Sequence, residues 1–263
     1  MNHDSNFFAA DPTTSKYDST PGRRLSSLAA TLRSAASMSM AEPEVRGLTQ
    51  LVSTGDTCFD IGAAYGMYSF PLAQLVGTPG AVHSFEPQPK PYSVLAAGRF
   101  ITKSTQIHVS RDAFSCRPRT EKMTVPTRFG LPIHGHAHIQ NDSSVPADRQ
   151  RGKRREITVN SRTVDQVTHD RGINRIDFMK IDAEGREPAI LAGAKEVLTR
   201  FRPTLLLEIE SRHLNRYDST PEELTDWLDE LGYAMYSWNN YQWRRTPRVT
   251  RRNRNYLFSH IER

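Results

Sequence analysis

Short apolar runs alternate along this chain with stretches that carry a helical pattern of apolar side chains. The runs that read as strands are Thr57–Ile61, Ala81–Phe85, Ile107–Phe114, Arg175–Ile181, Thr204–Glu210, Tyr233–Trp238 and Asn255–His260. The stretches that read as helices are Tyr68–Val76, Pro91–Phe100, Glu187–Arg200 and Pro221–Leu231. Strands that alternate with helices form βαβ units and a mostly parallel sheet. We therefore predict an α/β fold with a seven-stranded sheet, helices on both faces and a late antiparallel strand.

The length also bears on domain organisation. A chain of 263 residues exceeds the typical length of about 150 residues per domain, but α/β domains of this size are often one unit. Residues 1–22 are polar and read as an N-terminal arm, and residues 23–263 read as one domain. A long insertion at about 115–172 follows the third strand. Long insertions in α/β enzymes commonly shape the substrate side, and we expect the same here.

Composition argues against several other classes of protein. The apolar runs are far shorter than the roughly 20 residues that span a bilayer, and the N-terminus lacks a secretory pattern, so we expect no membrane partner. Two cysteines, Cys58 and Cys116, cannot build a disulfide framework, which indicates a reducing, cytoplasmic setting. The formal net charge is +6, and basic residues gather at Arg149–Arg155 and Arg244–Arg254. Few aromatic residues accompany these clusters, so we expect solvated loops and no specific nucleic-acid site.

The segment Asp60-Ile61-Gly62-Ala63-Ala64-Tyr65-Gly66 lies where the first predicted strand passes into the first helix. Glycines there let a ligand approach the backbone, with the helix N-terminus behind it. The dinucleotide fingerprint is Gly-x-Gly-x-x-Gly, whereas here the spacing is Gly-x-x-x-Gly and an aspartate ends the strand. A carboxylate at that point repels a pyrophosphate but suits the cationic groups of S-adenosylmethionine. A second acid, Glu86, ends the second strand and suits ribose hydroxyls.

These motifs resemble those of the FkbM-type methyltransferases. The segments DIGAAYG, SFEPQP, DAFS, DFMKIDAEGREPAILAGA and LLLEIE appear in the family's order, and the resemblance covers about residues 45–235. It implies a Rossmann-like methyltransferase fold and O-methylation of sugar or natural-product hydroxyls. One departure is Ala64, because the family commonly has asparagine at that position.

The resemblance also implies contacts to S-adenosylmethionine, residue by residue. Asp60, Gly62 and Gly66 would contact the methionine end, and Asp112 and Ala113 would border the adenine. Ala63 and Tyr65, inside the turn, complete the expected cofactor-binding residues, although core packing is the alternative for Tyr65.

Acidic residues follow the fourth and fifth predicted strands, next to the expected crevice. Asp182, Glu184 and Glu208 are the candidate catalytic residues, and Glu210 shares a strand face with Glu208. Two roles compete: general base for an acceptor hydroxyl, and ligation of Mg²⁺ by hard oxygen ligands. The structural alternative is that Glu184 braces the next helix and Glu208 pairs with an arginine such as Arg186.

Histidines offer further candidates. His134, His136 and His138 alternate and would share one face of a strand, where transition-metal binding or a substrate-side role is conceivable. His213, after the fifth strand, is a second-rank candidate base.

The leading functional hypothesis is an S-adenosylmethionine-dependent O-methyltransferase that acts on a carbohydrate or a glycosylated or secondary metabolite. The alternative is a methyltransferase that acts on RNA or protein, as the basic clusters suggest. A different class is a non-catalytic binder on this scaffold, which Ala64 suggests. A homo-oligomer is left open.

Overall fold

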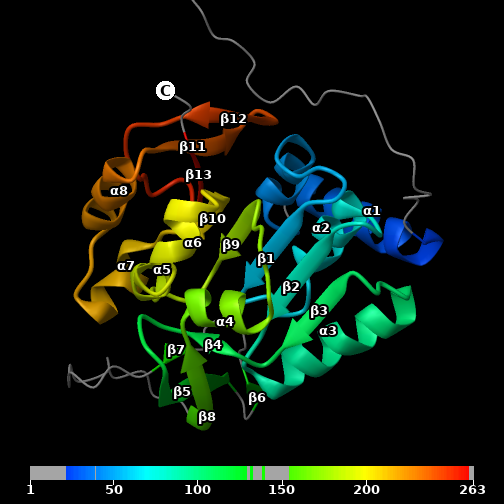
Figure 1. Cartoon of the computed structure of the whole chain (residues 1–263), viewed down its shortest axis with the longest axis horizontal. Coiled ribbons are helices and arrows are strands. Elements are labelled where there is room, and N and C mark those ends of the chain that lie inside the picture. The colour runs from blue at the N-terminus through cyan, green and yellow to red at the C-terminus, as the bar shows by residue number, and fades with distance from the viewer. Residues whose placement is uncertain (1–21, 39, 129–130, 133–137, 140–153, 261–263) are drawn as a thin grey trace, which may run out of the picture.

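The computed structural model describes residues 22–38, 40–128, 131–132, 138–139 and 154–260. Eight strands form the main sheet in the order β12-β11-β13-β10-β9-β1-β2-β3 (Figure 1). Their bounds are β1 Thr57–Ile61, β2 Ala81–Phe85, β3 Ile107–Ser110, β9 Phe178–Ile181, β10 Thr204–Glu208, β11 Tyr233–Asn239, β12 Gln242–Arg245 and β13 Asn255–His260. The pairs β3-β2, β2-β1, β1-β9 and β9-β10 are parallel, and β13 runs antiparallel to β10 and β11. This is the predicted Rossmann-like α/β fold.

Helices cover both faces of the sheet because successive side chains of each buried strand point to opposite sides. On one face, Cys58 packs with α1, η1, α2 and α3; on the other, Phe59 packs with α4, α5, α6 and α8. The bounds are α1 Arg23–Ser37, η1 Pro43–Gln50, α2 Ser69–Val76, α3 Pro89–Thr102, α4 Val164–Asp170, α5 Glu187–Ala192, α6 Lys195–Arg200, α7 Ser211–Leu214, η3 Asn215–Tyr217 and α8 Pro221–Glu230. The two buried clusters together stabilise the sheet through burial of apolar area.

Several details differ from the sequence predictions, among them helices η1 and α4, which the sequence did not indicate. The main sheet has an eighth strand, β12, which forms a hairpin with β11 and which we had not predicted. The predicted strand Ile107–Phe114 is two strands, because β4 (Ala113–Phe114) leaves the main sheet and pairs with β8. The predicted helix Glu187–Arg200 is interrupted at Gly193, where a Cβ would lie 2.3 Å from the carbonyl oxygen of Ser115.

The predicted insertion carries a second sheet. Its strands are β4, β5 (Arg119–Arg128), β6 (Leu131–Pro132), β7 (His138–Ile139) and β8 (Arg154–Arg162), and its longest pairing is β5 against β8, antiparallel. In Figure 1 this sheet lies next to the ends of β1 and β2 at which those strands finish. The insertion is therefore placed beside the carboxyl edge of the main sheet, where ligands bind in open α/β folds.

No helix in the part of the chain that the structure describes combines the length and apolar character of a membrane-spanning segment.

Candidate functional site

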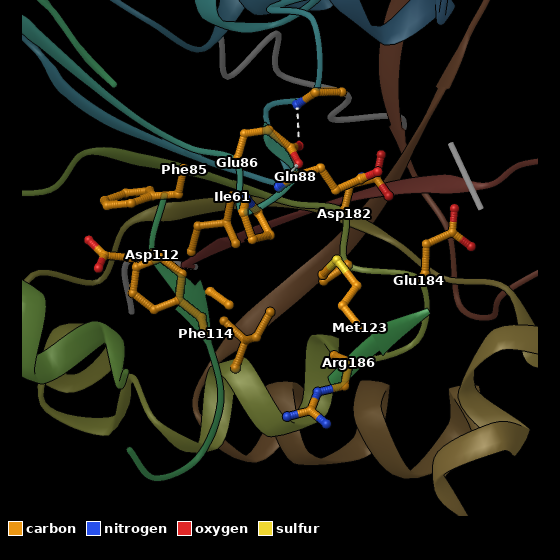
Figure 2. Close-up of a pocket in the computed structure, with 16 residues that line it drawn as sticks. Ile61, Phe85, Glu86, Gln88, Asp112, Phe114, Met123, Asp182, Glu184 and Arg186 are labelled. Atoms are coloured by element: carbon orange, nitrogen blue, oxygen red, sulfur yellow. Dashed lines mark hydrogen bonds between the residues drawn. The ribbon is translucent and has the colours of Figure 1, made fainter. Parts of the chain in front are cut away.

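A pocket opens at the carboxyl ends of β1, β2 and β9 (Figure 2). Its lining consists of Ile61, Gly62, Ala64, Phe85, Glu86, Pro87, Gln88, Asp112, Ala113, Phe114, Met123, Asp182, Ala183, Glu184, Arg186 and Ile190. Figure 2 shows Asp112 and Phe85 on one side of the pocket, Asp182 and Glu184 on the other, and Met123 and Arg186 below. The lining thus combines four acids with an apolar wall, and its one basic residue is Arg186.

The turn after β1 packs directly against the turn after β9. Gly62 has φ +78°, and a Cβ at this position would lie 1.9 Å from the carbonyl oxygen of Asp182. Glycine is required here first because the two backbones approach each other, and this contact brings the β9 loop to the pocket.

Glu86 connects the ends of β1 and β2. Its Oε2 accepts a hydrogen bond from the Ala64 N–H at 2.9 Å, and its Oε1 accepts one from the Gln88 N–H at 2.8 Å. Burial raises the pKa of Glu86 to about 7, against the lowering effect of these two N–H donors. A carboxylate has about four lone-pair sites, so both oxygens keep acceptor capacity for a ligand hydroxyl in the pocket.

Four of the eight predicted cofactor-binding residues line the pocket: Gly62, Glu86, Asp112 and Ala113. The other four lie beside it. Asp60 is fully buried on the α2 face of β1 and accepts a hydrogen bond from Ser69 Oγ at 2.5 Å, while its Oδ1 has no hydrogen-bond partner among the described residues.

Gly66 faces the protein interior, since a Cβ there would lie 2.5 Å from the Phe70 ring. Ala63 is buried and Tyr65 is half exposed. A ligand contact for these residues stays a prediction, and packing accounts for the glycine at position 66.

Asp112 forms an ion pair with Arg171. Its Oδ2 accepts hydrogen bonds from Ser110 Oγ at 2.6 Å and from the Arg171 guanidinium at 2.8 Å. The same guanidinium lies 5.1 Å from the centre of the Phe85 ring, and Phe85 meets Phe114 edge to face. This side of the pocket therefore offers aromatic surface next to a fixed carboxylate, which suits a flat heterocycle.

Asp182 forms a buried ion pair with Lys180 at 2.9 Å. Burial raises the pKa of Asp182, but the Lys180 ammonium outweighs it and leaves the pKa below its usual value. Burial lowers the pKa of Lys180, yet Asp182, Glu42 and Asp60 around it make the net shift upward. Asp182 therefore stays ionised and is the weakest base of the three candidates.

Glu184 sits on a strained turn that a neighbour holds in place. Its φ is +55°, a region that residues with a Cβ seldom adopt. Glu187 Oε1 accepts hydrogen bonds from the N–H groups of Ala183 at 2.8 Å and Gly185 at 3.3 Å. Glu187, and not Glu184 as the structural alternative supposed, is the residue that braces this loop. Burial, followed by the charges of Glu208 and Asp182, raises the pKa of Glu184 to about 8.

Glu208 ends β10 beside His213 of α7. Its Oε1 pairs with Arg254 at 2.9 Å, and its Oε2 lies 3.7 Å from His213 Nδ1. Burial raises the pKa of Glu208. Glu210 lies beyond the end of β10, but its backbone is still extended, and its carboxylate lies on the same side as that of Glu208, because both pair with Arg254. Glu210 also pairs with Arg212.

Arg186 joins the pocket to the second sheet and does not pair with Glu208. Its guanidinium contacts both oxygens of Glu121 on β5, at 3.1 and 3.2 Å, and donates to Ser115 Oγ at 2.8 Å. Ser161 on β8 donates to Glu121 as well. Buried arginine and glutamate stabilise each other in this bidentate geometry.

Comparison with known proteins identifies the family. The model of the methyltransferase FkbM domain matches residues 60–235, which include the pocket's strands and loops. This chain belongs to the FkbM methyltransferase family. The family assignment made from the five sequence motifs is confirmed.

Individual proteins and solved structures are also similar to this chain, at identities of 28% or less. The chain is 28% identical over 159 residues to the 31-O-demethyl-FK506 methyltransferase FkbM of Streptomyces tacrolimicus, which is 54% of this chain and 60% of that protein. This FkbM chain thus matches less than two thirds of the curated relative. An FkbM methyltransferase structure from Methylobacillus flagellatus KT aligns with 90% of this chain and 58% of its own, at 15% identity and a TM-score of 0.47. A putative rRNA methylase from Clostridium thermocellum aligns with 82% of this chain and 92% of its own, at 11% identity and a TM-score of 0.48.

The sequence ranked His213 as a second-rank candidate and did not single out Glu187. His213 lies between Glu184 and Glu208, and Glu187 holds the loop of Glu184. The position of Glu187 in the first turn of the next helix is the signal that could have indicated it. The predicted row of His134 and His136 lies outside the described residues, as does the side chain of His138.

Proposed function

We propose that this chain is an S-adenosylmethionine-dependent O-methyltransferase whose acceptor is a hydroxyl of a carbohydrate or a glycosylated or secondary metabolite. The observation that carries the proposal is one pocket with two acidic ends. Figure 2 shows Asp112 at one end, Asp182 and Glu184 at the other, and Glu86 between them. A cofactor at the first end and an acceptor at the second would meet in the middle of the same pocket.

The lining fits S-adenosylmethionine on chemical grounds. Glu86 offers oxygens to ribose hydroxyls, the Phe85 and Phe114 rings offer apolar surface to adenine, and acids suit a cationic methionine end. Among the described residues that line the pocket there is no lysine, and the one arginine is paired with Glu121, so these residues offer a pyrophosphate no unpaired cation. When bound, this cofactor supplies a methyl group activated by the adjacent sulfonium.

The chain's own residues must then align the acceptor oxygen and deal with its proton. Glu184 is the residue best placed for this role, since it lines the pocket and its pKa of about 8 lies near working pH. Its carboxylate would act on the hydroxyl proton directly, or together with Glu208 through a bound cation. The name of the Streptomyces relative, a methyltransferase of 31-O-demethyl-FK506, supports an oxygen acceptor here.

The insertion of about 115–172 would contribute acceptor selectivity, as expected from its length. Met123 of β5 lines the pocket, and Arg186 ties β5 to the loop that carries Glu184. The domain limits taken from the sequence, an arm over 1–22 and one domain over 23–263, stay part of this proposal.

The test combines calorimetry and turnover on the full chain. S-adenosylmethionine should bind one to one, and Glu86→Gln should weaken it by roughly 10- to 100-fold if two charge-assisted hydrogen bonds weaken. Glu184→Gln should lower kcat by about 10²- to 10⁴-fold with unchanged cofactor affinity. Glu230→Gln, exposed at the end of α8, is the control and should change neither.

Turnover is measured as S-adenosylhomocysteine release with panels of oligosaccharides, glycosylated metabolites, RNA and proteins. No cofactor binding by the folded protein would refute the proposal and leave a non-catalytic scaffold.

The alternative acceptors, RNA and protein, draw support from one observation. Arg244, Arg245, Arg248, Arg251 and Arg252 are exposed on β12 and the β12–β13 connection. None of them lines the pocket, so we keep the prediction that nucleic acid binds without specificity and dissociates as salt rises. Submicromolar RNA binding that persists at about 300 mM salt, together with methyl transfer to RNA, would reverse this choice.

A further inference from the structure

Three potential metal-ligand atoms converge at the acceptor end of the pocket, from three separate segments. Glu184 comes from the loop after β9, Glu208 from the end of β10, and His213 from α7. One ligand atom of each lies within 4.8 Å of the other two. His213 Nδ1 is 3.2 Å from Glu184 Oε2 and 3.7 Å from Glu208 Oε2.

These atoms are buried and lack hydrogen bonds. The exposed fraction of the side chain is 2% for His213, 5% for Glu208 and 12% for Glu184. Within the described part of the chain, His213 Nδ1, Glu208 Oε2 and Glu184 Oε2 have no hydrogen-bond partner. Leaving a buried polar atom unpaired costs about 1–3 kcal/mol, and more for a charged one. Three such atoms within 4.8 Å of one another form a set that a cation could bind.

Neighbouring charges define which atoms are free. Arg254 forms an ion pair with Oε1 of Glu208. Lys180 forms an ion pair with the Asp182 carboxylate, so Asp182 is not available as a ligand. Across the imidazole ring, His213 Nε2 lies 3.9 Å from Glu210 Oε2. A metal ion bound by Nδ1 would take the place of a proton there, and the imidazole N–H would then lie on Nε2, on the side of Glu210.

The donor set selects the metal. Mg²⁺ prefers oxygen ligands alone, and this expectation rested on Asp182, Glu184 and Glu208 as an all-oxygen group. In the structure the third potential ligand is His213 and not Asp182. A set of one imidazole and two carboxylates suits Mn²⁺, Fe²⁺ or Zn²⁺. Three protein ligands leave positions open for exogenous oxygen ligands, as in catalytic sites.

We propose that Glu184, Glu208 and His213 form a binding site for a divalent transition-metal ion at the acceptor end of the pocket. The proposal rests on the proposed function for its role: because Glu184 lines the pocket, an ion held there would coordinate the acceptor hydroxyl and lower the pKa of that hydroxyl. The hydroxyl proton would pass to solvent, the acceptor oxygen would form a bond to the methyl carbon, and the C–S bond of the sulfonium would break with release of S-adenosylhomocysteine.

The experiment measures metal binding directly. The full chain is treated with EDTA, dialysed, and titrated with Mn²⁺ (followed by the EPR signal of free Mn²⁺) and with Zn²⁺, with Mg²⁺ as a comparison. We expect one ion per chain, and a loss of affinity of at least 10- to 100-fold in His213→Ala and Glu208→Gln. His169→Ala, on the exposed side of α4, is the matched control and should bind as the wild type.

A second readout does not depend on any variant folding. Mn²⁺ bound to the wild-type protein should show nitrogen coupling in pulsed EPR, which requires an imidazole ligand. Absence of stoichiometric binding of Mn²⁺ and Zn²⁺ at about 100 μM, or binding without nitrogen coupling, overturns the proposal.

The two proposals fail in different ways. Cofactor binding and chelator-resistant turnover without metal binding would remove the metal site and keep the methyltransferase. Metal binding without any cofactor binding would keep the metal site and remove the methyltransferase.

Discussion

Glu187 makes the stability of this protein depend on pH in a way that one substitution should remove. Its carboxylate is buried, and Oε1 accepts the two N–H bonds that hold the loop of Glu184. Oε2 has no hydrogen-bond partner among the described residues. Burial, together with the charges of Asp182 and Glu208, raises the pKa of Glu187 to about 8. The perturbation is Glu187→Gln, in which the amide oxygen accepts the same two bonds.

The sign and size follow from proton linkage. An acid with a folded pKa of about 8 and an ordinary value of 4.5 holds its proton more tightly in the folded state. The contribution of Glu187 to stability is therefore greatest below pH 4.5 and falls as pH rises toward 8, by about 1.4 kcal/mol per pH unit for one proton. Between pH 5 and pH 8 the loss attributable to Glu187 is about 3 to 4 kcal/mol. The glutamine of Glu187→Gln does not titrate. From pH 5 to pH 8, the unfolding free energy of this variant should therefore decrease by about 3 to 4 kcal/mol less than that of the wild type.

Urea unfolding followed by tryptophan fluorescence at pH 5, 6, 7 and 8 provides the measurement, with a constant m-value as the check on two-state behaviour. The amide leaves an unpaired N–H at the Oε2 position, which costs about 1–3 kcal/mol at every pH and cancels in the pH difference. The exposed Glu222→Gln serves as the control. A difference between wild type and Glu187→Gln that is the same at pH 5 and pH 8 would refute the reasoning.

Three further predictions concern the pocket. Gly62→Ala should destabilise the protein by about 2–5 kcal/mol, because its Cβ would meet the Asp182 backbone at a position that also has a positive φ. Gly172→Ala, which has a positive φ but open space around the Cβ, should cost only about 1–2 kcal/mol. Equal melting temperatures for the two variants would contradict this prediction. Ala64→Asn should stabilise a residue held at φ +45° and tighten cofactor binding by roughly 2- to 12-fold through one added hydrogen bond, as calorimetry can check. Cofactor affinity should fall as pH drops below about 7, where Glu86 takes up a proton, and the profile should be flat in Glu86→Gln; a pH slope that survives the substitution would place the titrating group elsewhere.

Local patterns were sufficient for most of the fold. Strands β1, β2 and β13 begin and end where alternation and burial predicted, since their apolar runs are bounded by turn residues. Strand β12 was missed because Gln242–Arg245 is mostly polar and pairs only through a tight hairpin with β11. The break between α5 and α6 depends on Gly193 approaching Ser115, a contact between residues far apart in the sequence.

The site was predictable where it depends on strand ends and less so where it depends on long-range packing. Glu86, Asp182 and Glu184 follow strands that lie together at one edge of the sheet, and all three line the pocket. Asp60 was expected at the ligand, but strand alternation turns its carboxylate toward Ser69 under α2. The position of His213 between two glutamates depends on the path of α7, which no periodicity in the sequence specifies.

The Arg186–Glu121 pair limits how segments of this protein can be exchanged. A chimera that receives the insertion of another family member changes the pocket wall and the counter-ion of a buried guanidinium at the same time. A donor segment without an acid at the position of Glu121 would cost about 3–5 kcal/mol through the uncompensated charge. New acceptor preferences are therefore easier to reach by point substitutions around Met123 than by exchange of the whole segment. An exchanged segment would have to keep a glutamate at position 121 and a serine at position 161.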